Sequence, residues 1–110
     1  MEVDITLAGD LARFLSCIGE PTRLCILKLL ANGEKCVSDI VEALNIEQPL
    51  VSHHLKALKS CNIITGRPAA QKVYYELADP RLAELILKAE SIMKELCLCS
   101  PEQVPPRGDR

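Results

Sequence analysis

Tryptophan is absent from this sequence of 110 residues, and phenylalanine occurs once. Aromatic residues make up 3% of the chain, so a folded core has to be built from Leu, Ile, Val and Ala. The uncharged runs fall well short of the roughly 20 apolar residues that a membrane span needs. The first residues, 1–4, are acidic, whereas a secretory signal begins with basic residues. These absences predict a soluble, cytoplasmic protein, and the length leaves room for one domain.

Cysteine, in contrast, is frequent, with six residues. In a secreted chain of this length they would indicate a disulfide framework. Without an export signal, and with 48% hydrophobic residues available for a core, they are better interpreted as reduced thiols. Each is first expected to be a small buried hydrophobic side chain. Any functional assignment therefore depends on spacing.

Acidic residues are missing from one long segment, 48–75. The whole chain has a net charge of −2, with 13 basic and 15 acidic residues. The segment contains four basic residues and no Asp or Glu, which leaves nine basic and fifteen acidic residues in the rest of the chain. A basic surface on an acidic body attracts a polyanion in one orientation. The segment therefore predicts a nucleic-acid contact, against the alternative of an ordinary solvated face.

Hydrophobic periodicity predicts five helices and a β-hairpin. Ser38 is the expected N-cap of the third helix. The loop between the strands is expected to open with Gly66-Arg67-Pro68. The second helix is expected to bury Leu24, Leu27 and Leu30, and the last helix carries a continuous apolar stripe. The expected helices cover residues 4–18, 21–31, 39–44, 48–60 and 80–96, and the expected strands cover 63–65 and 72–77.

Short helices separated by a tight turn at 45–47 and followed by a hairpin make a winged helix-turn-helix. The predicted fold class is therefore mainly α with a β-hairpin wing. Residues 1–99 are expected to form the single domain. Residues 100–110 contain three prolines and no apolar pattern, and are expected to be a disordered tail.

The helix over 48–60 has two different faces. At about 100° per residue, Val51, Leu55 and Leu58 fall on one side and are expected to face the core. His54 lies beside them and is expected to be a partly buried, satisfied histidine. On the other face, amide, hydroxyl and imidazole groups can read base edges in the major groove, whereas lysines meet phosphates. The expected DNA contacts are Gln48, Ser52, His53, Lys56 and Lys59 on this helix, with Arg67, Gln71 and Lys72 in the hairpin.

The runs Glu20-Pro21-Thr22-Arg23-Leu24 and Gln-Pro-Leu-Val-Ser-His-His-Leu-Lys-Ala-Leu at 48–58, with Tyr-Tyr-Glu-Leu at 74–77, resemble the ArsR/SmtB family of repressors. The resemblance covers about residues 5–98. It implies a homodimer, joined through its first and last helices, that binds an inverted-repeat operator in double-stranded DNA and is released by an effector. One departure is Glu47, where many members have Ser or Thr as the N-cap, so the helix start is expected to be less fixed.

Compared with the family's sensing sites, this sequence lacks key ligands. The thiol site at the third helix typically reads Cys-Val-Cys-Asp, whereas this chain has Cys36-Val37-Ser38-Asp39. The zinc-type site on the last helix opens Asp-x-His, whereas this chain has Asp79-Pro80-Arg81, and no histidine follows His54. The resemblance therefore argues against a metal held by histidine and carboxylate.

Sulfur remains as the predicted sensing chemistry. Cys97-Leu98-Cys99 is the one Cys-x-Cys in the chain. No cofactor is expected to be obligatory, but As(III), Sb(III) or another soft metal ion prefers such thiolates. A third ligand is expected from Cys17, Cys25 or Cys61. Three alternatives stay open: a redox or reactive-sulfur sensor that closes a disulfide, a regulator without a thiol effector, and a winged helix that binds only proteins.

An enzyme is not predicted. The sequence contains no nucleophile–base pair, no glycine-rich phosphate loop and no complete catalytic metal motif. A chain of 110 residues also leaves little room for a catalytic cleft.

Overall fold

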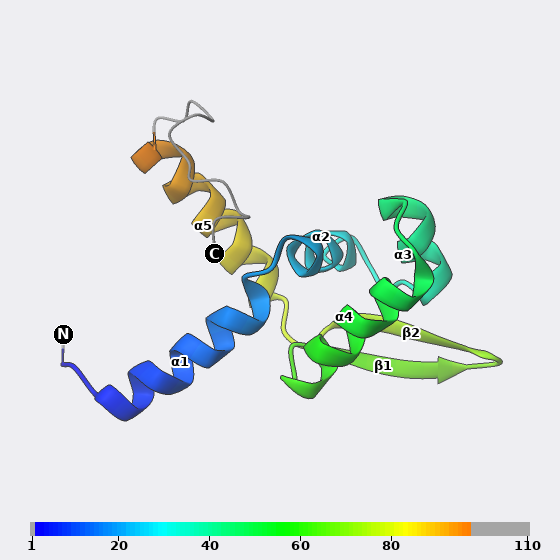
Figure 1. Ribbon diagram of the computed structural model, residues 1–110, viewed down its shortest axis with the longest axis horizontal. Helices are drawn as coiled ribbons and strands as arrows, with labels where there is room; N and C mark the ends of the chain where they lie inside the picture. The colour runs from blue at the N-terminus through cyan, green and yellow to red at the C-terminus, as the bar shows by residue number, and fades with distance from the viewer. Residues whose placement is uncertain (1, 98–110) are drawn as a thin grey trace.

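The structure, a computed structural model, describes residues 2–97. It is a mainly helical winged helix-turn-helix, as predicted (Figure 1). Two strands form an antiparallel hairpin in which Ile64 lies opposite Leu77 and Ala69 lies opposite Lys72. The elements are α1 (Ile5–Ile18), α2 (Pro21–Leu30), α3 (Val37–Leu44), α4 (Gln48–Ser60), β1 (Ile64–Ala69), β2 (Lys72–Leu77) and α5 (Arg81–Cys97).

Helix boundaries follow from local capping. The Asp4 carboxylate accepts a hydrogen bond from the Leu7 backbone N–H at 3.2 Å, so α1 begins at the next residue, Ile5. The prediction of Ser38 as the N-cap of α3 is wrong, because Cys36 occupies that position. The Asp39 carboxylate reaches back three residues and accepts the Cys36 backbone N–H at 3.1 Å. This bond lets α3 begin at Val37, two residues earlier than expected.

The hairpin turn also differs from the prediction. Gly66-Arg67-Pro68 lies within β1, and the strands are joined at residues 70–71, where Ala70 has a positive φ of 57°. Gly66 lies opposite Tyr75, and a Cβ there would meet Val73 Cγ1 at 3.0 Å. Glycine is therefore needed for close packing inside the hairpin rather than for its turn.

The core is aliphatic, as the lack of aromatic residues predicted. Its most buried side chains come from α2, α3, α4 and the hairpin, and α5 adds Leu82 and Ile86. In α2, Leu27 and Leu30 are buried as expected, but Ile26 is fully buried while Leu24 is only partly buried. The fully buried set is Ile26, Leu27, Ile40, Val51, Leu55, Leu58, Ile63 and Ile64.

Helices α1 and α5 extend away from this core on the side opposite the hairpin (Figure 1). Their apolar stripes remain largely exposed in the single chain: Leu11 keeps 52% and Ile92 46% of its surface accessible. Leu7, Leu15 and Leu85 are exposed as well. None of the helices in residues 2–97 has the length and apolar character to cross a bilayer.

Candidate nucleic-acid interface

Helix α4 presents the two faces that its sequence predicted. Val51, Leu55 and Leu58 are buried against the core. The turn before it, residues 45–47, is closed by Asn45 in the left-handed conformation with φ 55°. This turn sets α3 and α4 as the two helices of the helix-turn-helix motif. The side chains on the outer face of α4, all exposed, are Gln48, Ser52, His53, Lys56 and Lys59.

The start of α4 is held by backbone rather than by a side-chain cap. Glu47 is the N-cap, and its side chain makes no capping hydrogen bond to any residue that the structure describes. Its carbonyl accepts the backbone N–H groups of Leu50 and Val51, both at 3.1 Å. The departure from Ser or Thr at this position therefore removes one stabilising interaction next to Gln48.

The hairpin brings further polar groups beside α4. Gln71 and Lys72 are exposed at its tip, and both line a small cavity with Gln48. Arg67 is different, because Glu34 accepts hydrogen bonds from its guanidinium and the group lies 5.4 Å from the centre of the Tyr74 ring. The Glu34 carboxylate raises the pKa of Arg67 and offsets its charge. The cationic surface near α4 thus comes mainly from the lysines.

A partly buried polar network holds the inner side of α4. The Arg23 side chain donates from Nε to His54 Nδ1 at 3.1 Å and from Nη1 to the Cys17 carbonyl at 3.1 Å. Glu20 accepts the Arg23 backbone N–H at 2.9 Å. One guanidinium therefore joins the end of α1 and the start of α2 to the centre of α4. The sequence analysis assigned Arg23 no role, and its only signal was the Pro-Thr-Arg motif.

His54 is buried and hydrogen-bonded, as predicted. Burial lowers its pKa, and the charges of Arg23 and His53 act in the same direction, against the opposing effect of Glu20. Since its Nδ1 accepts a hydrogen bond from Arg23, the neutral imidazole fits this site.

The cysteines fall into different environments. Cys17 and Cys36 are buried, but Cys25 and Cys61 are exposed, so the expectation of small buried side chains is wrong for these two. Cys97 is the last residue of α5 in the described range, whereas Cys99 and the expected tail lie outside it. Within residues 2–97, no cluster of three or more His, Cys, Asp or Glu side chains is arranged to hold a metal ion.

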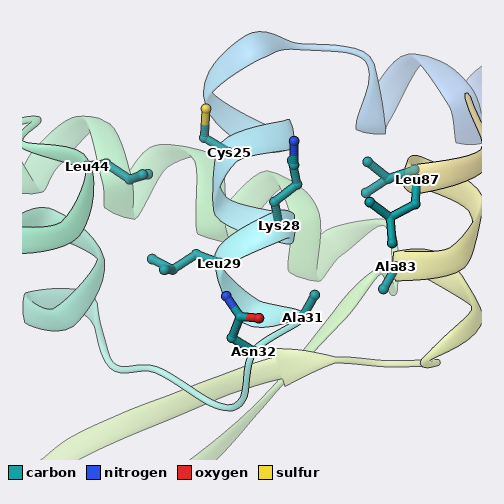
Figure 2. A pocket seen from close by; sticks show the side chains of 9 residues that line it. Cys25, Lys28, Leu29, Ala31, Asn32, Leu44, Ala83 and Leu87 are labelled. Atoms are coloured by element: carbon teal, nitrogen blue, oxygen red, sulfur yellow. The ribbon is translucent and has the colours of Figure 1, made fainter. Parts of the chain in front are cut away.

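Cys25 borders a groove of about 520 Å³ between α2 and α5. Figure 2 shows Cys25 and Lys28 on α2, with Ala83 and Leu87 of α5 across the groove. The lining is mostly apolar, so Cys25 is the one thiol in a largely hydrocarbon surface.

Comparison with known proteins places this arrangement among bacterial regulators. The family described as "Bacterial regulatory protein, arsR family" matches residues 20–65. The HTH-type transcriptional repressor SmtB of Mycobacterium tuberculosis is 43% identical over 82 residues, which are 74% of this chain and 58% of that protein. The chain thus spans less than two thirds of that relative.

Other relatives match over more of their length. A protein named as a probable mercury resistance operon repressor in Streptomyces lividans is 36% identical, over 99% of this chain and 89% of its own. The arsenical resistance operon repressor of Staphylococcus aureus is 33% identical, over 82% and 88%. A homodimeric winged helix-turn-helix DNA-binding domain from Mycobacterium bovis has a TM-score of 0.75 and 29% identity, over 89% and 94%.

Proposed function

The chain belongs to the ArsR family of bacterial regulatory proteins, which are transcription regulators rather than enzymes. From this premise we propose that it is a repressor released from DNA by a thiol-binding effector. The observation that carries the proposal is the outer face of α4. Five polar or basic side chains are exposed there, and the segment 48–75 contains no carboxylate to repel phosphate.

The DNA contacts divide by chemistry. Gln48, Ser52 and His53 lie near the start of α4 and are proposed to reach base edges, with Gln48 placed to pair with adenine. Lys56 and Lys59 are proposed to bind phosphates. Arg67, Gln71 and Lys72 of the hairpin are proposed to contact the adjacent backbone or minor groove. Of these, Arg67 first has to release Glu34.

A homodimer is proposed to form through α1 and α5. Large apolar side chains on both helices are exposed in the single chain, as in Leu11 and Ile92, and an exposed apolar patch of this kind marks an interaction surface. Twofold symmetry would set two copies of α4 against an inverted repeat, with half-sites about one DNA turn apart. The homodimeric relative from Mycobacterium bovis supports this arrangement.

The effector is proposed to be As(III), Sb(III) or another soft metal ion bound by sulfur. Cys97 and Cys99 supply two thiolates, and Cys17, Cys25 or Cys61 supplies the third. The relatives named for arsenical and mercury resistance support a thiophilic effector. Bound effector would favour a dimer geometry that no longer fits the operator, and such coupling typically changes DNA affinity about 5–150-fold.

Fluorescence anisotropy tests the whole proposal. The reduced protein is bound to labelled DNA from upstream of its own gene at fixed salt, and arsenite is then added to the complex. We expect tight binding that is lost at about stoichiometric arsenite. Cys97→Ser/Cys99→Ser should bind DNA unchanged but no longer respond, while Cys36→Ser, which removes a thiol outside the proposed ligand set, is the control and should still respond.

Each possible outcome tests a different part of the proposal. Release of DNA from Cys97→Ser/Cys99→Ser by arsenite would place the sensing site elsewhere. A complex that arsenite leaves intact would contradict the metalloid assignment and favour the redox alternative. In that case mild oxidation should produce a discrete crosslink on a non-reducing gel, reversed by a reductant. Failure to bind DNA at all would contradict the repressor function.

A further inference from the structure

Two cysteines that are far apart in the sequence meet at the end of α4. Cys17 lies in the last turn of α1, and Cys61 is the C-cap of α4. The Cys17 thiol donates to the backbone carbonyl of Ala57 with a sulfur–oxygen distance of 3.7 Å. The same carbonyl accepts the backbone N–H of Cys61 at 3.2 Å. Both cysteines therefore converge on one oxygen at the carboxyl end of the helix that carries the proposed DNA face.

The side chains of the pair interact directly. The pKa of the Cys17 thiol is raised to about 11, first by burial and then by a hydrogen bond and an electrostatic interaction with the Cys61 side chain. Arg23 lies 3.9 Å from the Cys17 sulfur and only partly offsets this rise. Cys17 is therefore a protonated thiol at neutral pH, and it has a second thiol as its neighbour. Because Cys61 is exposed, an ion in solution can reach the pair through it.

We propose that Cys17 and Cys61 form a second thiol site, within one subunit, that binds a soft metal ion accepting two sulfur ligands. This inference rests on the proposed thiol-responsive function and goes further by naming a separate ligand pair. Zinc needs four ligands, and As(III) prefers three thiolates. The part of the chain that the structure describes brings no third His, Cys, Asp or Glu into a metal-binding group, so a two-coordinate ion such as Hg(II) fits best.

The binding step involves no change in oxidation state. Each thiol loses its proton to solvent, two Hg–S bonds form, and Hg(II) keeps its charge state while two protons are released. A disulfide between the same residues would instead need an external oxidant and a reactive thiolate. Metal binding needs no oxidant, because the thiophilic ion displaces the proton of each thiol.

The position of the pair would allow metal binding to affect DNA binding. Cys17 belongs to α1, whose exposed apolar stripe is the proposed dimer face, and Cys61 ends α4, which carries the proposed DNA face. A metal ion bound to both residues ties these two helices together at one point. It also acts on the Cys17 end of the Arg23 network, which holds His54 in the middle of α4.

Mercuric ion titrated into the free, reduced protein is the direct test. Cys97→Ser/Cys99→Ser is the starting variant, so that the proposed sensing pair at the end of α5 cannot contribute. We expect one tightly bound Hg(II) per protomer, seen by native mass spectrometry and by sulfur-to-mercury charge-transfer absorption in the ultraviolet. In weak buffer near pH 7, about two protons should be released for each ion bound.

Further substitutions in this variant assign the ligands. Adding Cys61→Ser, at an exposed position that should not impair folding, should remove the tight site and its charge-transfer absorption. Adding Cys17→Ala should remove it too, which excludes a bridge between the Cys61 residues of two chains. Adding Cys25→Ser, at another exposed thiol, should leave the site unchanged. Retention of the tight ion after either Cys61→Ser or Cys17→Ala would overturn the proposal.

No DNA is present in this titration, so its result is independent of the repressor function. A protein that binds one Hg(II) at the pair but no DNA would contradict the proposed function and leave this site intact. A protein that binds DNA and responds to arsenite, yet shows no tight Hg(II) in the starting variant, would contradict only the Cys17–Cys61 site.

Discussion

At the scale of single residues, Arg23 links three helices, α1, α2 and α4. Its guanidinium contacts the Cys17 carbonyl and the His54 imidazole, so it holds α1 and α4 together from its place near the start of α2. The two residues that carry these acceptors, Cys17 and His54, are both buried. A buried acceptor that loses its donor costs more than an average hydrogen bond contributes.

Replacing Arg23 with lysine tests this role. The ammonium keeps the positive charge but cannot reproduce the two-pronged donor geometry, so one buried acceptor loses its partner. We expect Arg23→Lys to lower the free energy of unfolding by about 1–3 kcal/mol, measured by urea denaturation. Arg13→Lys, on the exposed surface of α1, is the matched control and should stay within about 0.5 kcal/mol of the parent. Equal effects of the two substitutions would contradict the role of Arg23.

The stability of the fold should depend on pH through His54. Its pKa in the folded state lies below the usual 6.5, so the unfolded chain binds a proton more readily than the folded one. The stabilising contribution is therefore complete above about pH 6.5 and is lost as the pH falls toward the lower folded value. Asp79, whose pKa is lowered to about 2 by Arg81, loses its contribution only in more acidic solution.

We expect the free energy of unfolding to fall between pH 7 and pH 5, and His54→Gln to show a flatter profile over that range. Glutamine retains an oxygen that can accept from Arg23 but has no proton to gain. Urea denaturation at a series of pH values gives the measurement. An unchanged slope in His54→Gln would assign the pH dependence to another group.

Burial of single side chains could be predicted only where the periodicity was unambiguous. In α4, polar residues separate Val51, Leu55 and Leu58, so the core face and the position of His54 followed from the sequence. In α2, apolar residues occupy almost every position from 24 to 30, and no face stands out. For this reason Leu24 and Cys25 were expected inside, although tertiary packing buries Ile26 in their place.

At the scale of elements, helices were easier to predict than the hairpin. Proline at the start of α2 and α4 and capping side chains fix helix ends through local interactions. The hairpin depends instead on contacts across strands, since Gly66 is required by the packing of Val73 and Tyr75. A sequence that places Gly and Pro together indicates a turn, and only the strand pairing shows that the turn lies at residues 70–71 instead of opening at Gly66.

If the residues of α4 divide between base and phosphate contacts as proposed, Lys56→Ala and Gln48→Ala should change DNA affinity in different ways. Lys56→Ala should weaken binding to operator and unrelated DNA alike, and it should reduce the slope of log affinity against log salt by about 1. Gln48→Ala should cost about 1–3 kcal/mol on the operator and little on unrelated DNA. Anisotropy titrations at several salt concentrations measure both effects.

Both residues are exposed, so neither substitution should affect folding. Lys88→Ala, on the exposed surface of α5, removes a charge of the same sign away from α4 and serves as the control. The assignment fails if Gln48→Ala weakens all DNA equally, or if Lys56→Ala changes only the operator.

At the scale of the whole molecule, the single chain leaves large apolar side chains of α1 and α5 exposed. The core takes in only the inner ends of these two helices, Cys17 and Ile18 of α1 and Leu82 and Ile86 of α5, and it leaves the rest of both stripes largely exposed. The helical spacing of apolar residues predicted the stripes. This spacing does not show whether a stripe is covered by the same chain or by another chain. That information came from the exposed fractions, such as 52% for Leu11.

A charge placed in the α1 stripe should therefore separate the subunits rather than unfold them. Leu11→Glu would bury a carboxylate in the proposed interface at a high free-energy cost, yet in the monomer this side chain is solvated. We expect a monomer by analytical ultracentrifugation, with helical circular dichroism retained and operator affinity strongly reduced, because one α4 can occupy only one half-site. Ser16→Glu introduces the same charge on a different side of α1 and should leave the dimer intact. A dimeric Leu11→Glu with unchanged DNA affinity would exclude α1 from the interface, and the inverted repeat would then have to be read by subunits joined through other surfaces.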